Sequence, residues 1–237
     1  MQTKGAWGFL RPWRKAFDLP SECAVCHAWP AQRVCADCTA RFTQPVRRCL
    51  RCALPLPSGA TTCGACLKQP PALDVCYAAV DYGYPWNHVL GDFKFRQDPA
   101  WASTLAPLLR SMPWVEPALE SADYLIPVPL ARERLLERGF NQSLELARAL
   151  SPAKVLPHAL VRIRTTDAQS RLHRAERLRN LRGAFAVHPH FAAPLHQQRV
   201  VLVDDVMTTG ATLEAAALVL RECGVAHLGA IVFARTP

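Results

Sequence analysis

The stretch VVLVDDVMTTGATL, residues 200–213, decides the fold of this chain. Its four leading apolar residues are typical of a central parallel strand that is buried on both faces. We expect this strand over residues 200–204 and a helix over residues 212–223. Two adjacent carboxylates, Asp204 and Asp205, follow the apolar run, and a turn of small residues separates them from the helix. The order is therefore strand, acidic pair, small-residue turn and helix.

The small-residue turn suits the binding of a phosphate. Backbone N–H groups in such a turn, threonine hydroxyls and the N-terminus of the following helix together form a cradle for an anion. Gly210 permits both the turn and the close approach of the anion. The acidic pair cannot bind phosphate, so we expect it to bind the vicinal hydroxyls of a ribose beside it. A turn that binds no ligand is the alternative, and it leaves the two adjacent carboxylates unexplained.

Apolar patterns in the rest of the chain alternate between strands and helices. Helices are expected around residues 89–93 and over residues 100–110 and 142–150, and strands over residues 75–82, 124–128, 158–164, 183–188 and 228–234. This alternation predicts an α/β fold with a mostly parallel sheet and crossover helices. Ligands of such sheets lie beyond the carboxyl ends of the strands.

Eight of the ten cysteines form four Cys-x-x-Cys pairs, and two such pairs make a tetrahedral four-cysteine site. The sequence predicts two structural zinc ions with no open position for catalysis. The short gap between the first two pairs favours sequential pairing, and a cross-braced arrangement also fits the spacing. The expected ligands of the first ion are Cys23, Cys26, Cys35 and Cys38, and those of the second are Cys49, Cys52, Cys63 and Cys66.

Other uses of the cysteines require conditions that the sequence does not meet. Disulfides and the haem-attachment string Cys23-Ala-Val-Cys26-His27 both need an exported protein, and no signal peptide is recognisable at the N-terminus. A redox Cys-x-x-Cys is normally single and follows a strand. An iron–sulfur cluster stays open as an alternative, because four thiolates also suit it.

Charge and composition limit which partners and which cellular location we expect. The formal net charge is +9, and two zinc ions bound by eight thiolates would bring it to about +5. This excess favours polyanionic partners, either nucleic acid or phosphorylated small molecules. No apolar run is long enough to span a membrane, so we expect a cytoplasmic protein. The predicted organisation is an N-terminal extension (residues 1–19), a double zinc ribbon (20–70), a short stiff linker (68–73) and an α/β domain (74–237).

The string DDVMTTGATL resembles the phosphoribosyl pyrophosphate (PRPP) motif of type I phosphoribosyltransferases. Several further blocks, standing in order, resemble the ComF family of competence-related proteins, and together they cover about residues 20–237. These blocks are the paired cysteine ribbons, Lys94-Phe95-Arg96, Pro127-Val128-Pro129, Arg138-Gly139-Phe140-Asn141-Gln142, and an arginine-rich arm with Gln169, Leu172, Arg177, Asn180 and Gly183-Ala184-Phe185. Arg171 and Gln97 depart from the family pattern, where glycine is common.

The resemblance implies a type I phosphoribosyltransferase fold with an N-terminal double zinc ribbon. It assigns the ribose hydroxyls and any catalytic role to Asp204 and Asp205, and the pyrophosphate to a loop with Arg132. Mg²⁺ would bind with PRPP, on the oxygens of the ligand. The 5′-phosphate would be held by Thr208, Thr209, Gly210, Ala211 and Thr212. The arm would act as a lid over PRPP, with Arg164, Gln169, Arg177 and Asn180 as its family residues.

Three functions follow from this resemblance. The first is a PRPP-binding factor that acts in uptake and processing of single-stranded DNA, as in natural transformation and the use of external DNA, with a DNA-uptake helicase or another protein as partner. The second is an active phosphoribosyltransferase on a nitrogen base or a nucleotide-salvage substrate. The third is an adaptor that senses PRPP or a nucleotide and recruits partners through the ribbons. No segment after the last strand is long enough for an acceptor hood, so we expect any hood to come from residues 76–115, the ribbons or a partner.

Overall fold

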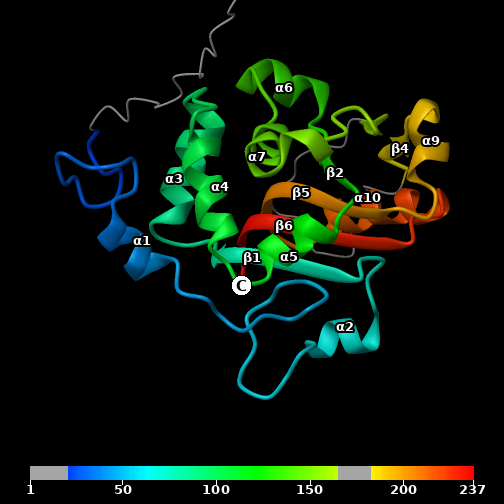
Figure 1. The fold of residues 1–237 in the computed structure, drawn as a ribbon, viewed down its shortest axis with the longest axis horizontal. Helices are drawn as coiled ribbons and strands as arrows, with labels where there is room; N and C mark the ends of the chain where they lie inside the picture. Colours follow the sequence, from blue (N-terminus) through cyan, green and yellow to red (C-terminus); the bar gives the residue numbers. More distant parts are fainter. Residues whose placement is uncertain (1–20, 165–182) are drawn as a thin grey trace, which may run out of the picture.

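The computed structural model describes residues 21–164 and 183–237. The extension at residues 1–19 and the arm with Gln169, Arg177 and Asn180 lie outside these described residues. Four parallel strands form the central sheet in the order β1-β6-β5-β2 (Figure 1). Their bounds are β1 (Val75–Asp81), β2 (Tyr124–Pro127), β5 (Arg199–Met207) and β6 (His227–Arg235). The α/β fold with a parallel sheet is therefore confirmed.

Strand β5 is longer than the sequence pattern indicated. The expected end at Asp204 is wrong, because β5 continues through the acidic pair and ends at Met207. Val206 pairs with Ala234 and Met207 with Arg235, so the parallel partner β6 keeps the backbone extended beyond the carboxylates. The carboxylates consequently project from a paired strand, and the turn begins only after it.

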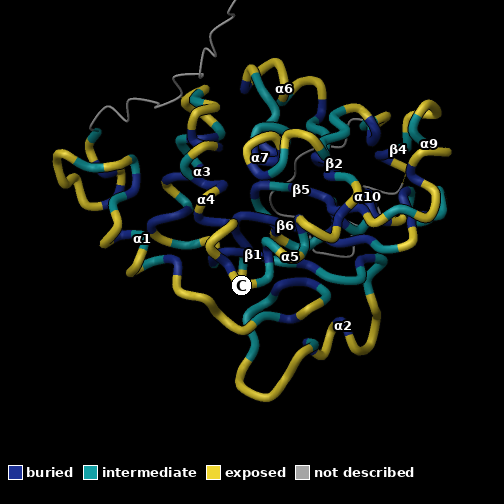
Figure 2. The backbone as a smooth tube through the Cα atoms, in the orientation of Figure 1, coloured by how far each residue is buried: buried dark blue, intermediate teal, exposed yellow. Residues whose placement is uncertain are grey.

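The two faces of the sheet belong to two hydrophobic cores. Alternate residues of β5 enter them, with Val201 and Val203 in the first core and Val200 and Leu202 in the second. Helices α3, α4, α5 and α7 cover the first face, while α10, α9 and the β3-β4 hairpin contribute to the second (Figures 1 and 2). The bounds are α3 (Trp86–Phe95), α4 (Trp101–Arg110), α5 (Val115–Ser121), α7 (Gln142–Leu150), α9 (Pro189–Leu195) and α10 (Ala211–Glu222).

Several elements differ from the expectation or were not foreseen. The strands expected over residues 158–164 and 183–188 are three-residue antiparallel strands, β3 (Leu160–Arg162) and β4 (Phe185–Val187). Short elements with few apolar positions escaped the periodicity argument. They are α1 (Ala36–Phe42), α2 (Gly64–Lys68), α5, α6 (Arg132–Arg138), α9 and a 3-10 turn, η1 (Pro152–Lys154). None of the helices among the described residues combines the length and apolar character needed to cross a bilayer.

Each cysteine ribbon extends one of the two cores. The first ribbon, residues 21–45, contributes Cys23 and Cys38 to the core under α3 and α4, where Trp86 Nε1 donates to the Phe42 carbonyl at 2.8 Å. The second ribbon, residues 46–68, contributes its four cysteines to the other core. In Figure 1 the first ribbon lies beside α3 and the second lies below the sheet, near the C-terminus.

At each outer edge of the sheet, the edge strand forms a hydrogen bond with an irregular segment. On β1, the Cys76 N–H donates to the Leu50 carbonyl of the second ribbon at 2.7 Å. On β2, the Leu156 N–H donates to the Leu125 carbonyl at 2.9 Å. Each edge strand therefore has a neighbour that is not itself a strand.

The segment at residues 68–73 is not the linker that its prolines suggested. Leu73 is 1% exposed and belongs to the second core. The Ala72 N–H donates to the Glu214 carboxylate at 3.1 Å, and Arg221 Nε donates to the Ala72 carbonyl at 3.0 Å. The two prolines stiffen the chain, but its far end is fixed to α10 by packing and hydrogen bonds.

Truncating Leu73 to alanine should therefore destabilise the whole protein. A buried Leu→Ala change costs about 2–5 kcal/mol. Leu67→Ala is a matched control, because Leu67 is 70% exposed and such surface changes stay within about 0.5 kcal/mol. Urea unfolding of both variants measures the difference, and equal midpoints would show that residues 68–73 behave as a linker.

Candidate functional site

The acidic pair at the end of β5 is held by groups from two helices. Ser143 Oγ, in the first turn of α7, donates to Asp204 Oδ1 at 2.8 Å, and the Asp205 N–H donates to the same oxygen at 2.9 Å. Lys94 Nζ, near the end of α3, lies 3.1 Å from Asp205 Oδ2. The two carboxylates therefore have different partners, a hydroxyl for one and an ammonium for the other.

Burial and the neighbouring charge of Asp205 give Asp204 an unusual affinity for a proton. Burial, and then the negative charge of Asp205, raise the pKa of Asp204 to about 7, although the Ser143 hydroxyl and the Lys94 charge oppose the shift. Asp204 can thus be protonated or ionised near neutral pH. A ligand that donates hydroxyl hydrogen bonds or brings positive charge would favour the ionised form.

The block Arg138-Gly139-Phe140-Asn141-Gln142 places Ser143. Gly139 ends α6 with a φ of 77°, a left-handed conformation that favours glycine. Asn141 then caps α7, because its Oδ1 accepts from the Ser143 N–H at 3.0 Å. Its Nδ2 donates to the Val128 carbonyl at 3.0 Å, which ties the cap to the loop after β2. The cap thus fixes the residue that contacts Asp204.

Arg138 joins this block to the Lys94-Phe95 block. Its side chain is buried, with Nη1 donating to Gln142 Oε1 at 3.0 Å and the guanidinium 5.4 Å from the centre of the Phe95 ring. Burial lowers the pKa of Arg138, while the charges of Asp205 and Asp204 oppose that shift. Two blocks that are 44 residues apart in the sequence therefore meet beside the acidic pair.

The sequence indicated these blocks but not their roles. Lys94 and Arg138 stood in motif blocks and had no assigned partner, and Ser143 was not singled out. Their contacts with the acidic pair depend on tertiary packing, so spacing alone carries no signal for them. The motif blocks themselves were the only available signal.

The predicted phosphate-binding residues form a loop at the start of α10, which we call the glycine loop (residues 208–212). Gly210 is the N-cap of α10 with a φ of 81°, and a Cβ there would lie 2.5 Å from Met207 Cε. Thr209 Oγ1 accepts from the Ala211 N–H at 3.4 Å. The loop therefore follows directly on the strand that bears Asp204 and Asp205, and Gly210 cannot be replaced without strain.

Basic residues gather at α6 and at the base of the β3-β4 hairpin. Arg132 begins α6 and Arg164 follows β3, and both are exposed. Burial, and then repulsion from Arg134, lower the pKa of Arg162, so the two elements are close enough to interact. The assignments of Arg132 to pyrophosphate and of Arg164 to a lid stay predictions. Gln169, Arg177 and Asn180 lie outside the described residues.

The eight predicted metal ligands form two separate clusters. Cys23, Cys26, Cys35 and Cys38 make one and Cys49, Cys52, Cys63 and Cys66 the other, with all sulfurs of a cluster within 4.8 Å of one another. Sequential pairing is thus confirmed and the cross-braced arrangement is wrong. None of the eight forms a disulfide.

The sulfur geometry fits a single tetrahedral ion. Cys26 and Cys35 place their Sγ atoms 3.6 Å apart, and Cys52 and Cys63 place theirs 3.7 Å apart. A tetrahedral site with Zn–S bonds of about 2.3 Å requires about 3.8 Å between sulfurs. The Cys63 N–H also donates to Cys49 Sγ at 3.3 Å, as expected of a knuckle that stabilises thiolates. Both clusters therefore fit structural zinc, with no position left for a substrate.

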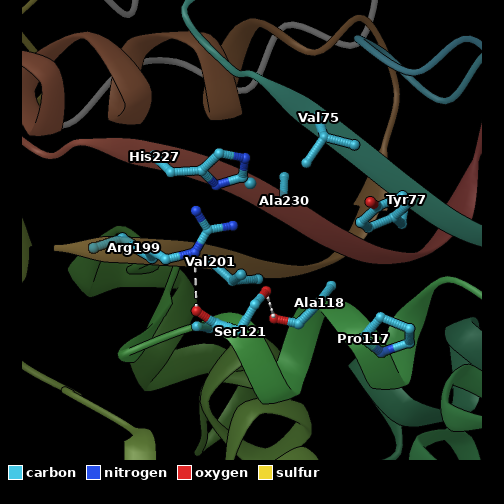
Figure 3. Close-up of a pocket in the computed structure, with 12 residues that line it drawn as sticks. Val75, Tyr77, Pro117, Ala118, Ser121, Arg199, Val201, His227 and Ala230 are labelled. Carbon is cyan, nitrogen blue, oxygen red and sulfur yellow. Dashed lines mark hydrogen bonds between the residues drawn. The ribbon is translucent and has the colours of Figure 1, made fainter.

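A separate cavity of about 250 Å³ lies at the opposite, amino-terminal end of the strands. Figure 3 shows Arg199 and His227 at one end of it and Tyr77 at the other. Arg199 Nε donates to the Ser121 carbonyl at 3.0 Å. None of the predicted site residues lines this cavity, so the acidic pair and the glycine loop form a distinct site.

The sequence of residues 141–237 matches the family model described as phosphoribosyl transferase domain. The matched segment contains α7, β5, the glycine loop and β6, and so holds both aspartates and Ser143. Lys94 lies upstream of it. The fold is therefore that of a phosphoribosyltransferase domain preceded by two four-cysteine clusters.

Similar proteins extend over most of the chain. DNA utilization protein YhgH of Salmonella typhimurium is 31% identical over 227 residues, covering 92% of this chain and 98% of the relative. Competence protein F of Haemophilus influenzae is 35% identical over 189 residues, covering 76% of this chain and 81% of the relative. The chain belongs to the ComF family. Another ComF relative, competence protein ComFC of Bacillus subtilis, is 29% identical over 212 residues, covering 83% of this chain and 81% of the relative.

The raised pKa of Asp204 predicts a pH-dependent stability for this ComF protein. The stability gained from neutral Asp204 is complete below the ordinary carboxyl pKa of 3.8 and is lost as the pH rises through about 7. Between pH 6 and 8, the ligand-free wild type should therefore lose about 1.4 kcal/mol relative to Asp204→Asn. Denaturant unfolding at several pH values measures this difference.

The control variant is Glu222→Gln, which removes an exposed carboxyl on the last turn of α10. Its stability should follow that of the wild type across the same pH range. A constant difference between the wild type and Asp204→Asn would contradict the assigned shift.

Proposed function

We propose that this ComF-family protein binds PRPP at the acidic pair and the glycine loop, and that it acts in the uptake and processing of single-stranded DNA. The observation that carries the PRPP assignment is the acidic pair near the end of β5, followed, after four intervening residues, by the glycine-capped N-terminus of α10. The acidic pair suits ribose hydroxyls and the helix N-terminus suits a phosphate. A phosphoribosyl ligand carries both groups.

In this proposal the acidic pair accepts hydrogen bonds from the ribose. Asp204 and Asp205 each accept from a ribose hydroxyl, while Lys94 and Ser143 hold their carboxylates in place. The glycine loop, with Thr208, Thr209, Gly210, Ala211 and Thr212, binds the 5′-phosphate through backbone N–H groups and hydroxyls. Arg132 meets the pyrophosphate, and Mg²⁺ accompanies PRPP on its own oxygens. The two four-cysteine clusters hold structural zinc.

The DNA-related role rests on the relatives and on charge. The relatives carry the names DNA utilization protein and competence protein. Exposed arginines at α6 and after β3 give the protein a basic surface beside the loop that follows β2. We assign this role to the cytoplasm, with the ribbons at residues 20–70 and the α/β domain at residues 74–237 as its two parts.

Transfer chemistry is a second candidate, favoured by the two adjacent carboxylates, one of which, Asp205, pairs with Lys94. Loss of pyrophosphate from C1 of PRPP would leave positive charge on the ribose, and adjacent carboxylates would stabilise it. The fold does not establish this reaction, because a binding protein can keep the same site. Pyrophosphate release with a panel of nitrogen bases distinguishes a transferase from a protein that only binds.

Calorimetry with Mg²⁺ and PRPP tests the binding site. The double variant Asp204→Asn/Asp205→Asn removes the charge of both acceptors and should weaken binding about a hundredfold or more, because each hydrogen bond to a charged group contributes about 1.5–3 kcal/mol. Glu120→Gln, which changes an exposed carboxyl on α5, should bind like the wild type. Equal affinity for all three proteins would place the ligand elsewhere.

Anisotropy with a fluorescent single-stranded oligonucleotide tests the basic surface. The variant Arg132→Gln/Arg164→Gln removes two exposed charges and should reduce the slope of log affinity against log salt by about 1.4. The matched control Arg199→Gln removes an exposed charge at the opposite end of the sheet and should leave the slope unchanged. An unchanged slope in the double variant would rule out this surface as the DNA contact.

A further inference from the structure

Arg235, the last residue of β6, contacts the second ribbon and the glycine loop at the same time. The residue is 7% exposed, and its Nε donates to the Cys52 carbonyl at 2.9 Å. Its Nη1 donates to the Met207 carbonyl at 3.2 Å and to the carbonyls of Thr208 and Thr236. One guanidinium thus spans from a four-cysteine cluster to the first residue of the loop.

Within the described part of the chain, the buried guanidinium of Arg235 hydrogen-bonds only to backbone carbonyls. Among the described residues, no carboxylate lies within ion-pair distance of Arg235. By contrast, Arg48 of the second ribbon, whose side chain is also buried, pairs with Asp81 at 2.6 Å. A buried guanidinium needs its donors satisfied, and the planar fork allows few alternative geometries. The position of Arg235 is therefore determined by the carbonyls that surround it. A zinc ion with four thiolates carries net negative charge, which favours a cation beside that cluster.

The carbonyl on the ribbon side belongs to a metal-ligand residue. Cys52 places its Sγ 3.7 Å from that of Cys63 within the second cluster. The next residue, Ala53, has a φ of 57°, and its carbonyl accepts from Arg48 Nη1 at 3.2 Å. A metal bound by the Cys52 side chain restricts the backbone of this knuckle. The direction of the Cys52 carbonyl then depends on the metal.

The loop packs directly against the same ribbon. A small cavity of about 20 Å³ lies between them, and its walls include Cys52, Thr209 and Gly210. Behind the loop, Cys76 Sγ lies 3.6 Å from Met207 Sδ. The knuckle and the loop therefore line the same small cavity and share Arg235 as a hydrogen-bond donor.

The first ribbon contacts a different part of the protein. Its Arg33 Nη1 donates to Asp98 Oδ2 at 2.7 Å, and the guanidinium lies 5.0 Å from the Trp101 ring centre. This contact joins the first ribbon to the start of α4. Arg33 and Arg235 thus each join one ribbon to the α/β domain, Arg33 through a partly exposed ion pair and Arg235 through buried hydrogen bonds.

We propose that Arg235 is a positioning residue that couples the second four-cysteine cluster to the glycine loop, so that metal in this cluster sets the shape of the phosphate-binding backbone. The proposal rests on the proposed role of the loop in binding PRPP. The metal of the first cluster has no equivalent connection through Arg33. Loss of the second metal, or of the Arg235 side chain, lets the Thr208 carbonyl and the N–H groups of the loop move.

Two measurements on the full-length protein test this coupling. Arg235→Met should weaken Mg–PRPP binding by about tenfold, corresponding to the loss of a buried hydrogen-bond network, and should speed hydrogen exchange at residues 208–212. Arg235→Lys keeps the charge but cannot span both carbonyls, so its effect should be intermediate. Arg33→Met is the control and should change neither quantity more than about twofold. All measurements are made well below the unfolding temperature of each variant.

The same two measurements, Mg–PRPP affinity and hydrogen exchange at residues 208–212, are repeated on variants that lose one metal each. Cys49→Ser should release one zinc per chain and reproduce the exchange pattern of Arg235→Met, whereas Cys23→Ser should release one zinc and leave residues 208–212 protected. Wild-type protection of the loop in Arg235→Met, or equal effects of the two cysteine variants, would overturn the coupling. If the wild type binds no PRPP, the proposed function fails, and the exchange data still decide the coupling.

Discussion

The buried Asp205 and the half-buried Asp204, near the end of β5, require partners that the strand itself cannot supply. Two neighbouring carboxylates repel one another, and desolvation adds to the cost. Lys94 on α3 and Ser143 on α7 supply the compensation, which requires both helices to pack over the carboxyl end of the sheet. The Asn141 cap, the left-handed Gly139 and the buried Arg138 all serve to place these partners. The arrangement of the first core therefore follows from the need to hold one acidic pair.

The second core is built around the four-cysteine cluster of the second ribbon. The four cysteines of the second ribbon share this core with α10 and with the inner residues of β5 and β6. Arg235 and Glu214 link the ribbon side to the glycine loop and to α10. The acidic pair of the candidate site thus contacts helices on one face of the sheet, and the glycine loop is joined through Arg235 to a ribbon on the other. The sheet brings the acidic pair and the glycine loop together at its carboxyl edge.

Local patterns predicted the parts of this protein whose signal is local. The cysteine spacing predicted both clusters, and apolar runs predicted the four strands of the sheet. Spacing could not show that β5 continues to Met207, because pairing with β6 extends the strand. It also could not show that Leu73, which follows two prolines, is buried. The roles of Lys94 and Ser143 were equally hidden, because each contacts a residue that is more than sixty positions away in the sequence. Where a role depends on long-range contacts of this kind, the sequence shows the motif but not what its residues contact.

The irregular segments along the two sheet edges have a consequence for association between chains. An uncovered edge strand is a template for pairing with a strand of another molecule, and proteins commonly block it. Here Leu50 of the second ribbon forms a hydrogen bond with β1 at Cys76, and Leu156 forms one with β2 at Leu125. A second molecule can pair with the sheet at these two positions only by displacing one of these segments. The metal-binding ribbon thereby also protects the protein against edge-to-edge aggregation, a risk that would grow on its loss.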